Sequence, residues 1–437
     1  MKNLRLVNSY FEMSSNSANS AMGSIAAKIY YNAQVTNCYI DAILTNKAAE
    51  GATSVVDTVS IGGIVGAFGQ SNTNMSWSPV ISNCVFAGSI LDNLGATGGI
   101  IGWVPHSDAQ GATATMTISN CLNLGSVNSS VSDTNVSAIV GSVNWQNVKV
   151  TISKCMNLST NVPIEVLGNP NNGMLSVSDY YVVNGLRAKD NYVYKGNTTA
   201  WAQGKTLSDF LNNGIHDWTY KAGYVPNPTT HTDIPLSAII NAETLGLQTT
   251  GDVTSVRIST ENKGLRFETF VSDNGVNLLA ELKKVEGATV AMNTYISAGK
   301  YFTGDGALTE FTAKALDNGV EAGSKYLKVT ATEFLHQEGN GYNTFAGSVV
   351  KIKDVDMEYI AVGCVTVTVG GVTYDIYADW STDEITSVSA VATIAANDTK
   401  TEAAEGYGHL ITNENEESVY SPYTQAQYDC IVSLKSN

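Results

Sequence analysis

An Asn-Cys pair recurs inside strand-like segments throughout the first part of the chain. "VISNCVFAGSI" begins at Val80, and its close variant "MTISNCLNLGSV" begins at Met116. Aligned on the pair, the series reads Asn8-Ser9, Asn37-Cys38, Asn83-Cys84, Asn120-Cys121, Lys154-Cys155 and Asp179-Tyr180. The steps run from 25 to 46 residues. Internal periods of this size predict stacked repeats, each too small to bury its own apolar side.

A second, glycine-containing element alternates with the Asn-Cys strands in a constant order. It reads "GSIAA" from Gly23, "GGIVG" from Gly62, "GGIIG" from Gly98 and "SAIVG" from Ser137. Stacking places the isoleucines of each element over their counterparts in the next coil and forms one continuous core. The paired glycines are typical of a tight corner or a close approach between backbones.

The spacing of apolar residues predicts a bend within each Asn-Cys strand. Ile118 and Cys121 are three residues apart, so regular alternation cannot direct both side chains inward. A bend at Ser119 and Asn120 resolves this conflict, because Asn tolerates left-handed backbone. We therefore expect an inward, unbridged column made of Cys38, Cys84, Cys121 and Cys155.

A zinc site and a set of disulfides both fit these cysteines less well than a buried column. A zinc site needs closely spaced ligand pairs, and neither such pairs nor histidines accompany these residues. Disulfides between stacked coils are not excluded by distance, but side chains in line along parallel strands seldom have suitable directions. A bridge between Cys364 and Cys430, outside the repeats, stays open.

The motif "ISNC-x-x-x-G-x-[IV]" followed by "GGI[IV]G" resembles the GLUG-type repeats of bacterial surface proteins and adhesins. The resemblance covers roughly residues 5–185 and implies a right-handed parallel β-solenoid, here of about five to six repeats over residues 1–185. Ser9 and Tyr180 depart from the pattern at its two ends, as terminal repeats commonly do. In such proteins the repeats serve as stalks or as accessory parts of enzymes.

Residues 186–224 are predicted to form a capping segment, and residues 225–250 a linker. Leu207, Phe210 and Leu211 share one face of a short helix that Thr206 or Ser208 would cap and Gly214 would end. Trp201 and Trp218 are expected in the core of this cap, which resembles the tails that follow such repeats. The linker stretch "GYVPNPTTHTDIP" contains three of the eight prolines.

Residues 251–437 read as an acidic antiparallel β-sandwich. "EYIAVGCVTVTVGGVTYDIYADW" predicts a hairpin that turns at Gly370-Gly371. The last 188 residues contain 26 acidic and 13 basic residues, whereas the first 180 contain 9 and 6. The module is similar to a β-rich module at the C-terminal ends of Gram-positive surface proteins. The chain shows no LPxTG-type tail, so wall anchoring is not implied.

Charge and hydropathy narrow the class of partner. A net charge of −16 without basic runs argues against nucleic acid. No apolar run reaches the ~18 residues that a membrane span needs, so no membrane insertion is expected. The opening "MKNLRLVNSYFEM" lacks the apolar region of a secretory signal and enters a repeat directly. We therefore expect a fragment of a longer protein.

Carboxylates are the first candidates for chemistry. Glu12 and Asp41 occupy equivalent positions in the repeat alignment and are expected to stack, but a solvated face is the simpler interpretation. No nucleophile, metalloprotease or phosphate-loop motif appears, so we expect a protein that is not an enzyme. Asp354, Asp356 and Glu358 alternate along an expected strand and would suit Ca²⁺, although a solvated acidic face is again the alternative. No other cofactor is indicated.

Aromatic residues are the remaining candidates for binding. Trp103 and Trp145 follow the "IIG" and "IVG" elements of neighbouring repeats, and Trp77 lies in a polar insert. Flat aromatic rows bind sugar faces, so these three are the candidate ligand-binding residues; packing under loops is the alternative. Tyrosine is also abundant, with 21 residues.

Together these patterns predict a secreted or cell-surface, non-catalytic protein of a Gram-positive bacterium. Its partners would be glycans or a protein on a host or partner cell, and its role adhesion or ligand presentation. The alternatives are an accessory region of a polysaccharide-degrading enzyme and a purely structural stalk. The sequence leaves the oligomeric state open.

Overall fold

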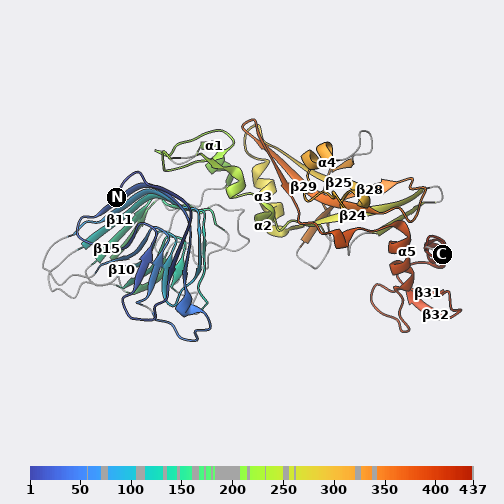
Figure 1. Ribbon diagram of the computed structural model, residues 1–437, viewed down its shortest axis with the longest axis horizontal. Helices are drawn as coiled ribbons and strands as arrows, with labels where there is room; N and C mark the ends of the chain where they lie inside the picture. The colour runs from blue at the N-terminus through green and yellow to red at the C-terminus, as the bar shows by residue number, and fades with distance from the viewer. Residues whose placement is uncertain are drawn as a thin grey trace. The chain divides into compact units, whose positions relative to one another are not determined.

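The chain forms two compact units. Figure 1 shows the computed structural model. Unit 1 comprises Met1–Ile240, Asn277–Ala288 and Val369–Val372, and unit 2 comprises Asn241–Val276, Thr289–Thr368 and Thr373–Asn437. The structure describes residues 1–56, 58–69, 77–104, 114–130, 135–144, 148–159, 167–171, 174–178, 181–182, 207–213, 217–231, 233–249, 255–259, 262–319, 326–336 and 342–435.

Unit 1 contains a parallel β-solenoid, and its largest sheet is built from the Asn-Cys strands. Its long members pair in parallel with their counterparts one repeat away. They are β1 (Arg5–Met13), β4 (Gln34–Asn46), β7 (Val80–Phe86), β11 (Ala114–Asn123), β15 (Val148–Ser153) and β18 (Met174–Ser178). Shorter members are β8 (Ser89–Asp92), β12 (Ser126–Val127), β16 (Met156–Asn157) and β19 (Tyr181–Val182).

The glycine-containing elements form the corner between the other two parallel sheets. One sheet contains β2 (Ala21–Gly23), β5 (Ser60–Gly62), β9 (Ala96–Gly98) and β13 (Val136–Ser137). The other contains β3 (Ala26–Ile29), β6 (Val65–Phe68), β10 (Ile101–Val104), β14 (Val140–Asn144) and β17 (Leu167–Asn171). The expected parallel β-solenoid is confirmed.

The cysteine column is also confirmed. Cys84 is the register partner of both Cys38 and Cys121, and pairing on either side of Cys155 continues the column. All four side chains are fully buried and none forms a disulfide. Each thiol donates a weak hydrogen bond, 3.2–3.4 Å long, to the carbonyl two residues earlier.

A left-handed residue before each cysteine produces the bend. The φ angles are 53° at Asn37, 52° at Asn83, 51° at Asn120 and 50° at Lys154. This conformation interrupts alternation once per coil, which allows an Ile and a Cys three residues apart to point inward together. Asn is enriched there because its short polar side chain tolerates left-handed backbone.

The first coil departs from the expected alignment. Arg5 pairs with Tyr39, so Asn3-Leu4 corresponds to Asn37-Cys38, and Asn3 has a φ of 58°. The side-chain amide of Asn37 donates to Asn3 Oδ1 at 2.7 Å. The expected member, Asn8, lies instead where the register shifts between Leu6 and Ser9, also with a positive φ. The sequence alignment therefore matched Asn8 with Asn37, whereas the strand register matches Asn3 with Asn37. The difference arises from the bulge at Asn8.

Steric contact explains the glycines at the corner. A Cβ atom on Gly62 would lie 1.8 Å from the carbonyl oxygen of Val65, and one on Gly98 would lie 2.1 Å from that of Ile101. The chain reverses so tightly that the carbonyl three residues on occupies the side-chain position. At the equivalent Ser137 the hydroxyl donates to the carbonyl of Val140 at 2.6 Å.

Residues 217–231, which we call the outer strap, cross several coils along the left-handed residues. Asp217 pairs with Lys154 at 3.0 Å, and the indole of Trp218 donates to Asn120 Oδ1 at 3.2 Å. Thr230 exchanges two hydrogen bonds with the Asn37 side chain, and His231 Nε2 lies 2.6 Å from the Asn37 carbonyl oxygen. The strap thereby fastens coils that are not neighbours in the stack.

A short helix precedes the strap, as expected. Helix α1 (Leu207–Asn213) buries Leu207, Phe210 and Leu211, and the Phe210 ring lies 6.0 Å from that of Trp218. Thr206, Gly214 and Trp201 lie outside the described residues. Three short elements follow α1 in unit 1: β20 (Tyr224–Val225), β21 (Ile234–Pro235) and η2 (Leu236–Ala238). A short 3-10 helix, η1 (Lys47–Ala49), follows β4 in the solenoid.

Unit 2 is built on two antiparallel sheets packed face to face. One contains β22 (Gln248–Thr249), β23 (Ser255–Ser259), β24 (Asn262–Ser272), β27 (Leu335–His336) and β28 (Tyr342–Val350). The other contains β25 (Thr289–Ala298), β26 (Leu327–Ala331), β29 (Tyr359–Val369) and β30 (Val372–Tyr377). Gly347 faces Thr294 and Gly363 faces Thr269 across the interface, and a Cβ on either glycine would meet the threonine within 2.6 Å. The expected sandwich is confirmed.

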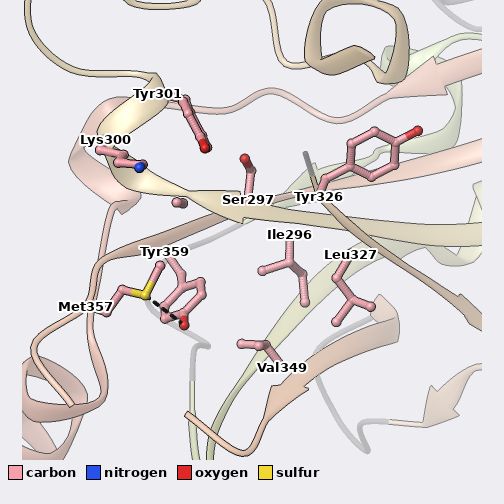
Figure 2. Close-up of a pocket in the computed structure, with 10 residues that line it drawn as sticks. Ile296, Ser297, Lys300, Tyr301, Tyr326, Leu327, Val349, Met357 and Tyr359 are labelled. Carbon is pink, nitrogen blue, oxygen red and sulfur yellow. Dashed lines mark hydrogen bonds between the residues drawn. The ribbon is translucent and has the colours of Figure 1, made fainter. Parts of the chain in front are cut away.

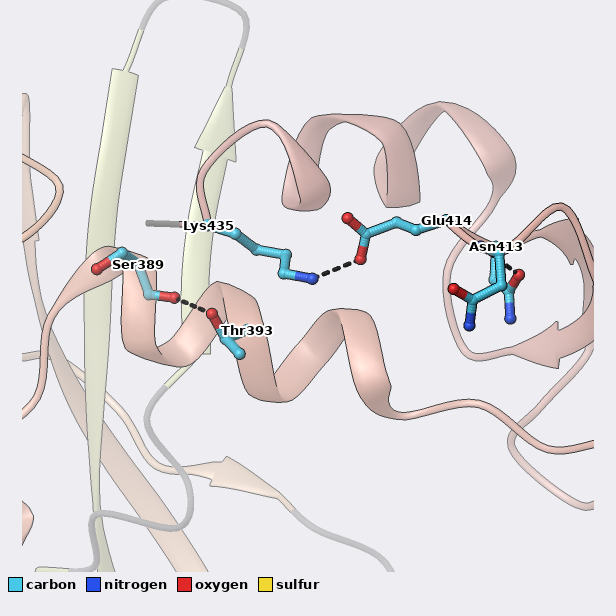
Figure 3. A network of polar contacts seen from close by, with 6 residues as sticks. Ser389, Thr393, Asn413, Glu414 and Lys435 are labelled. Carbon is cyan, nitrogen blue, oxygen red and sulfur yellow. Dashed lines mark hydrogen bonds and ion pairs between the residues drawn. The ribbon is translucent and has the colours of Figure 1, made fainter. Parts of the chain in front are cut away.

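The sandwich carries helices that the sequence did not predict. They are α2 (Ala242–Leu245), α3 (Asp273–Leu282), α4 (Ala313–Gly319), α5 (Val388–Asn397) and α6 (Gln425–Val432). Helices α5 and α6 bury Val388 and Ile431 in one apolar cluster with Phe267 of β24. Ser387 caps α5 by accepting from the Ala390 amide, and Thr393 donates back to the Ser389 carbonyl (Figure 3).

Between α5 and α6 the chain forms a hairpin of β31 (His409–Thr412) and β32 (Ser418–Ser421). Lys435, after α6, pairs with Glu414 in the hairpin turn (Figure 3). The sheets also carry η4 (Gly299–Tyr301) and η5 (Thr382–Glu384).

We expect Asn83→Val to lower the free energy of unfolding by about 1–2 kcal/mol, because a β-branched residue is strained in left-handed backbone. Asn83→Gly should stay close to wild type. Ser82→Val, next to it in ordinary strand conformation, is the matched control. Guanidinium denaturation followed by circular dichroism measures all three, and equal stabilities for the two valine variants would contradict the prediction.

Thiol labelling tests the cysteine column. Five of the six cysteines are buried and Cys430 is partly exposed. We expect Ellman's reagent at pH 8 to titrate one thiol rapidly in the folded protein and five more only on unfolding. Cys430→Ala should remove the rapid phase, and a second rapid thiol in that variant would show that the column is accessible.

Candidate functional site

The tryptophans singled out from the sequence are buried where the structure describes them. Trp77 is 6% exposed and packs edge-on against Phe68, whereas Trp103 is 5% exposed in a small cluster with Ala67 and Ala96. Neither indole N–H has a partner within the described part of the chain. Trp145 lies outside the described residues. The two described rings belong to separate clusters and do not form a row.

The three acidic residues proposed as calcium ligands lie around a turn. Asp354 Oδ1 accepts the Asp356 amide at 3.1 Å, and Asp356 Oδ1 accepts the Ser389 hydroxyl at 2.6 Å. Glu358 is exposed beside them. These bonds direct the carboxylates to different partners. Among the described residues, no group of three or more His, Cys, Asp or Glu side chains is arranged to hold a metal ion.

The carboxylate pair expected in the solenoid is not formed. The register places Glu12 opposite Thr45, not opposite Asp41. Glu12 pairs instead with Lys47 at 2.9 Å and accepts the Tyr10 hydroxyl at 2.9 Å. Because the bulge in β1 shifts the register before Glu12, equivalence by sequence alignment does not hold there.

A pocket of about 380 Å³ lies at one end of the sandwich (Figure 2). We call it the tyrosine pocket. The end of β25, η4, the start of β26 and the start of β29 contribute residues from one sheet, and β28 contributes Val349 from the other. Its lining is Ile296, Ser297, Ala298, Lys300, Tyr301, Tyr326, Leu327, Val349, Met357 and Tyr359.

The tyrosine pocket combines aromatic faces with a few polar groups. Tyr301, Tyr326 and Tyr359 reach it from three separate segments, and Leu327 and Met357 are 43% and 41% exposed. The ammonium of Lys300 lies 5.0 Å from the centre of the Tyr301 ring, a cation–π contact. Lys300 forms no ion pair with any described residue and is exposed to solvent.

Two of the rings are held in place by neighbouring groups. Tyr326 packs against the buried ring of Tyr295 with centroids 5.3 Å apart. The Tyr359 hydroxyl lies 3.3 Å from Met357 Sδ (Figure 2), and burial, followed by the Asp354 carboxylate, raises the pKa of Tyr359 above its usual value. Tyr359 therefore stays a neutral hydrogen-bonding phenol at physiological pH.

These residues were not singled out from the sequence, although a weak signal exists. The dipeptide Lys-Tyr occurs at Lys300-Tyr301, after β25, and again at Lys325-Tyr326, before β26. Tyrosine is common in strands because it packs well there, so the two dipeptides alone do not indicate a binding site. They do so only once the structure brings the ends of β25, β26 and β29 together.

Comparisons with protein-family models, with curated proteins and with solved structures find no match to this chain. No helix in the described part of the chain is both long enough and apolar enough to cross a membrane. The site is therefore interpreted from its own geometry.

The packing behind the pocket predicts a loss of stability in alkali. Burial raises the pKa of Cys364 to about 12, and burial likewise raises that of Tyr377 to about 12. Unfolded thiols ionise near about pH 8.5 and phenols near about pH 10. Above these values the unfolded chain loses protons that the folded chain keeps, so the free energy of unfolding falls as pH rises towards 12.

We expect Cys364 to contribute up to about 1.4 kcal/mol of this loss per pH unit above pH 8.5. Denaturation of wild type and Cys364→Ala at pH 7.5, 9 and 10.5 measures it. The variant should show the shallower decline, and parallel pH profiles for the two proteins would contradict the assignment.

Proposed function

We propose that this chain is a non-catalytic, extracellular or cell-surface binding protein that recognises glycans, in the service of adhesion. The observation that carries the proposal is the tyrosine pocket, where three phenol rings meet beside an exposed lysine. The resemblance of the Asn-Cys motif to GLUG-type repeats of bacterial surface proteins supports an extracellular or cell-surface location. The similarity of the sandwich to a β-rich module of Gram-positive surface proteins supports a Gram-positive source.

The chemistry of a sugar ring suits this pocket. A pyranose has one face of C–H groups, which packs on an aromatic ring, and a rim of hydroxyls. Tyr301 and Tyr326 supply rings, while Lys300 and the phenol hydroxyls supply hydrogen-bonding groups. The last 188 residues carry an excess of 13 negative charges, which opposes the approach of acidic glycans. We therefore propose a neutral glycan.

The solenoid is proposed to act as the support for this module. Its coils are joined by parallel backbone hydrogen bonds and share a continuous apolar core, so it is a stiff element. The same arrangement would serve an accessory region of a polysaccharide-degrading enzyme, because a glycan site of this kind would hold an enzyme on its substrate.

A glycan array probed with the full chain tests the proposal. We expect binding to neutral glycans that falls at least tenfold, about 1.4 kcal/mol, in Tyr326→Ala and in Lys300→Ala. Lys300 is exposed and lies over the face of the Tyr301 ring, so its replacement leaves the core of the sandwich intact, whereas the loss of Tyr326 removes a ring that packs against Tyr295. Tyr220→Ala removes an exposed tyrosine of unit 1 and is the matched control.

Absence of binding to every glycan would overturn the proposal, as would binding that both pocket variants retain. Release of product from a bound polysaccharide would instead favour an enzyme.

A further inference from the structure

Tyr31 adopts a backbone conformation that bulky residues rarely occupy. Its φ is 53°, within the left-handed region. At the other described non-glycine positions of the solenoid, that region is occupied by Asn, which tolerates it, and once by Lys154. The Tyr31 side chain is 54% exposed, so burial does little to offset the strain. A strained residue whose ring remains half exposed suggests a functional role.

The turn that holds Tyr31 is well defined. It connects β3 to β4, and the amide of Ala33 donates to the carbonyl of Tyr30 at 3.1 Å. The side chain of Asn32 accepts the Ser78 amide at 2.8 Å, which ties this corner to the next coil. These bonds fix the backbone in its strained state.

Aromatic rings from two coils meet at this corner. The Tyr31 ring lies 5.0 Å from that of Trp77, edge to face, and 6.5 Å from that of Tyr30, which is 42% exposed. Trp77 is itself buried against Phe68. Gly69 makes room for Tyr30, because a Cβ atom there would lie 2.1 Å from its ring. Trp77 therefore supports the Tyr31 ring, which in turn lies beside that of Tyr30.

We infer that Tyr30 and Tyr31, with the Tyr31 ring packed against Trp77, form a second sugar-binding surface on the solenoid. We call it the aromatic corner. The inference rests on the proposed function, because it extends the same ligand class, neutral glycans, to a second site in unit 1. Two sites on one chain raise the apparent affinity for a surface that displays many copies of a glycan.

The backbone strain gives a test that separates binding from structure. Tyr31→Asn replaces the ring with a residue suited to left-handed backbone. We expect this variant to melt at a higher temperature than wild type while its affinity for immobilised neutral polysaccharide falls about tenfold. Tyr10→Asn is the matched control, because Tyr10 is 57% exposed on β1 without a positive φ. It should show neither the gain in melting temperature nor the loss of affinity.

The probes are a β-glucan, a galactomannan and a xylan, each immobilised, with the full chain in solution. Tyr31→Asn combined with Lys300→Ala should bind more weakly than either single variant. Wild-type affinity in Tyr31→Asn, with loss only in Lys300→Ala, would overturn the aromatic corner and leave the proposed function standing. A lower melting temperature for Tyr31→Asn would show that the ring is structural and also overturn it. No binding by wild type to any probe would refute the proposed function itself.

Discussion

The solenoid depends on one backbone conformation that recurs along the stack: a left-handed residue immediately before an inward side chain, which is Leu4 in the first coil and a cysteine in the next four. Without that residue, a strand that buries Ile118 would turn Cys121 outward. With the left-handed residue in place, both side chains point inward, and each coil pairs in register with the parallel strands of its neighbours. Parallel hydrogen bonding then places like residues over like, so Cys84 meets both Cys38 and Cys121.

The repeat made the solenoid predictable, because periodic sequence and periodic structure share one cause. The Asn bend, the buried cysteines and the glycine corner each follow from residues that recur at fixed offsets. The first coil was misaligned because a bulge inserts an extra left-handed Asn8, and sequence similarity cannot tell a bulge from a register position. The same shift separates Glu12 from Asp41.

The sandwich was predictable at the level of its strands and its Gly370-Gly371 turn, where both residues have positive φ. Helix α5 was missed because "VSAVATIAAN" is rich in β-branched residues, and its helical state depends on the Ser387 cap and on packing against α6. The tyrosine pocket was missed for a related reason. Its residues belong to segments that approach one another only when β25, β26 and β29 pair.

The outer strap has a consequence for the mechanical resistance of the solenoid. In a bare solenoid, a pulling force peels one coil at a time from an end, and only the last set of backbone bonds resists. The strap bonds to Lys154, Asn120 and Asn37, which belong to different coils. Force that reaches any of these coils is therefore shared with the others, and peeling begins only after the strap has been torn away. Asn37, Asn120 and Lys154 thus anchor the strap as well as bend the chain.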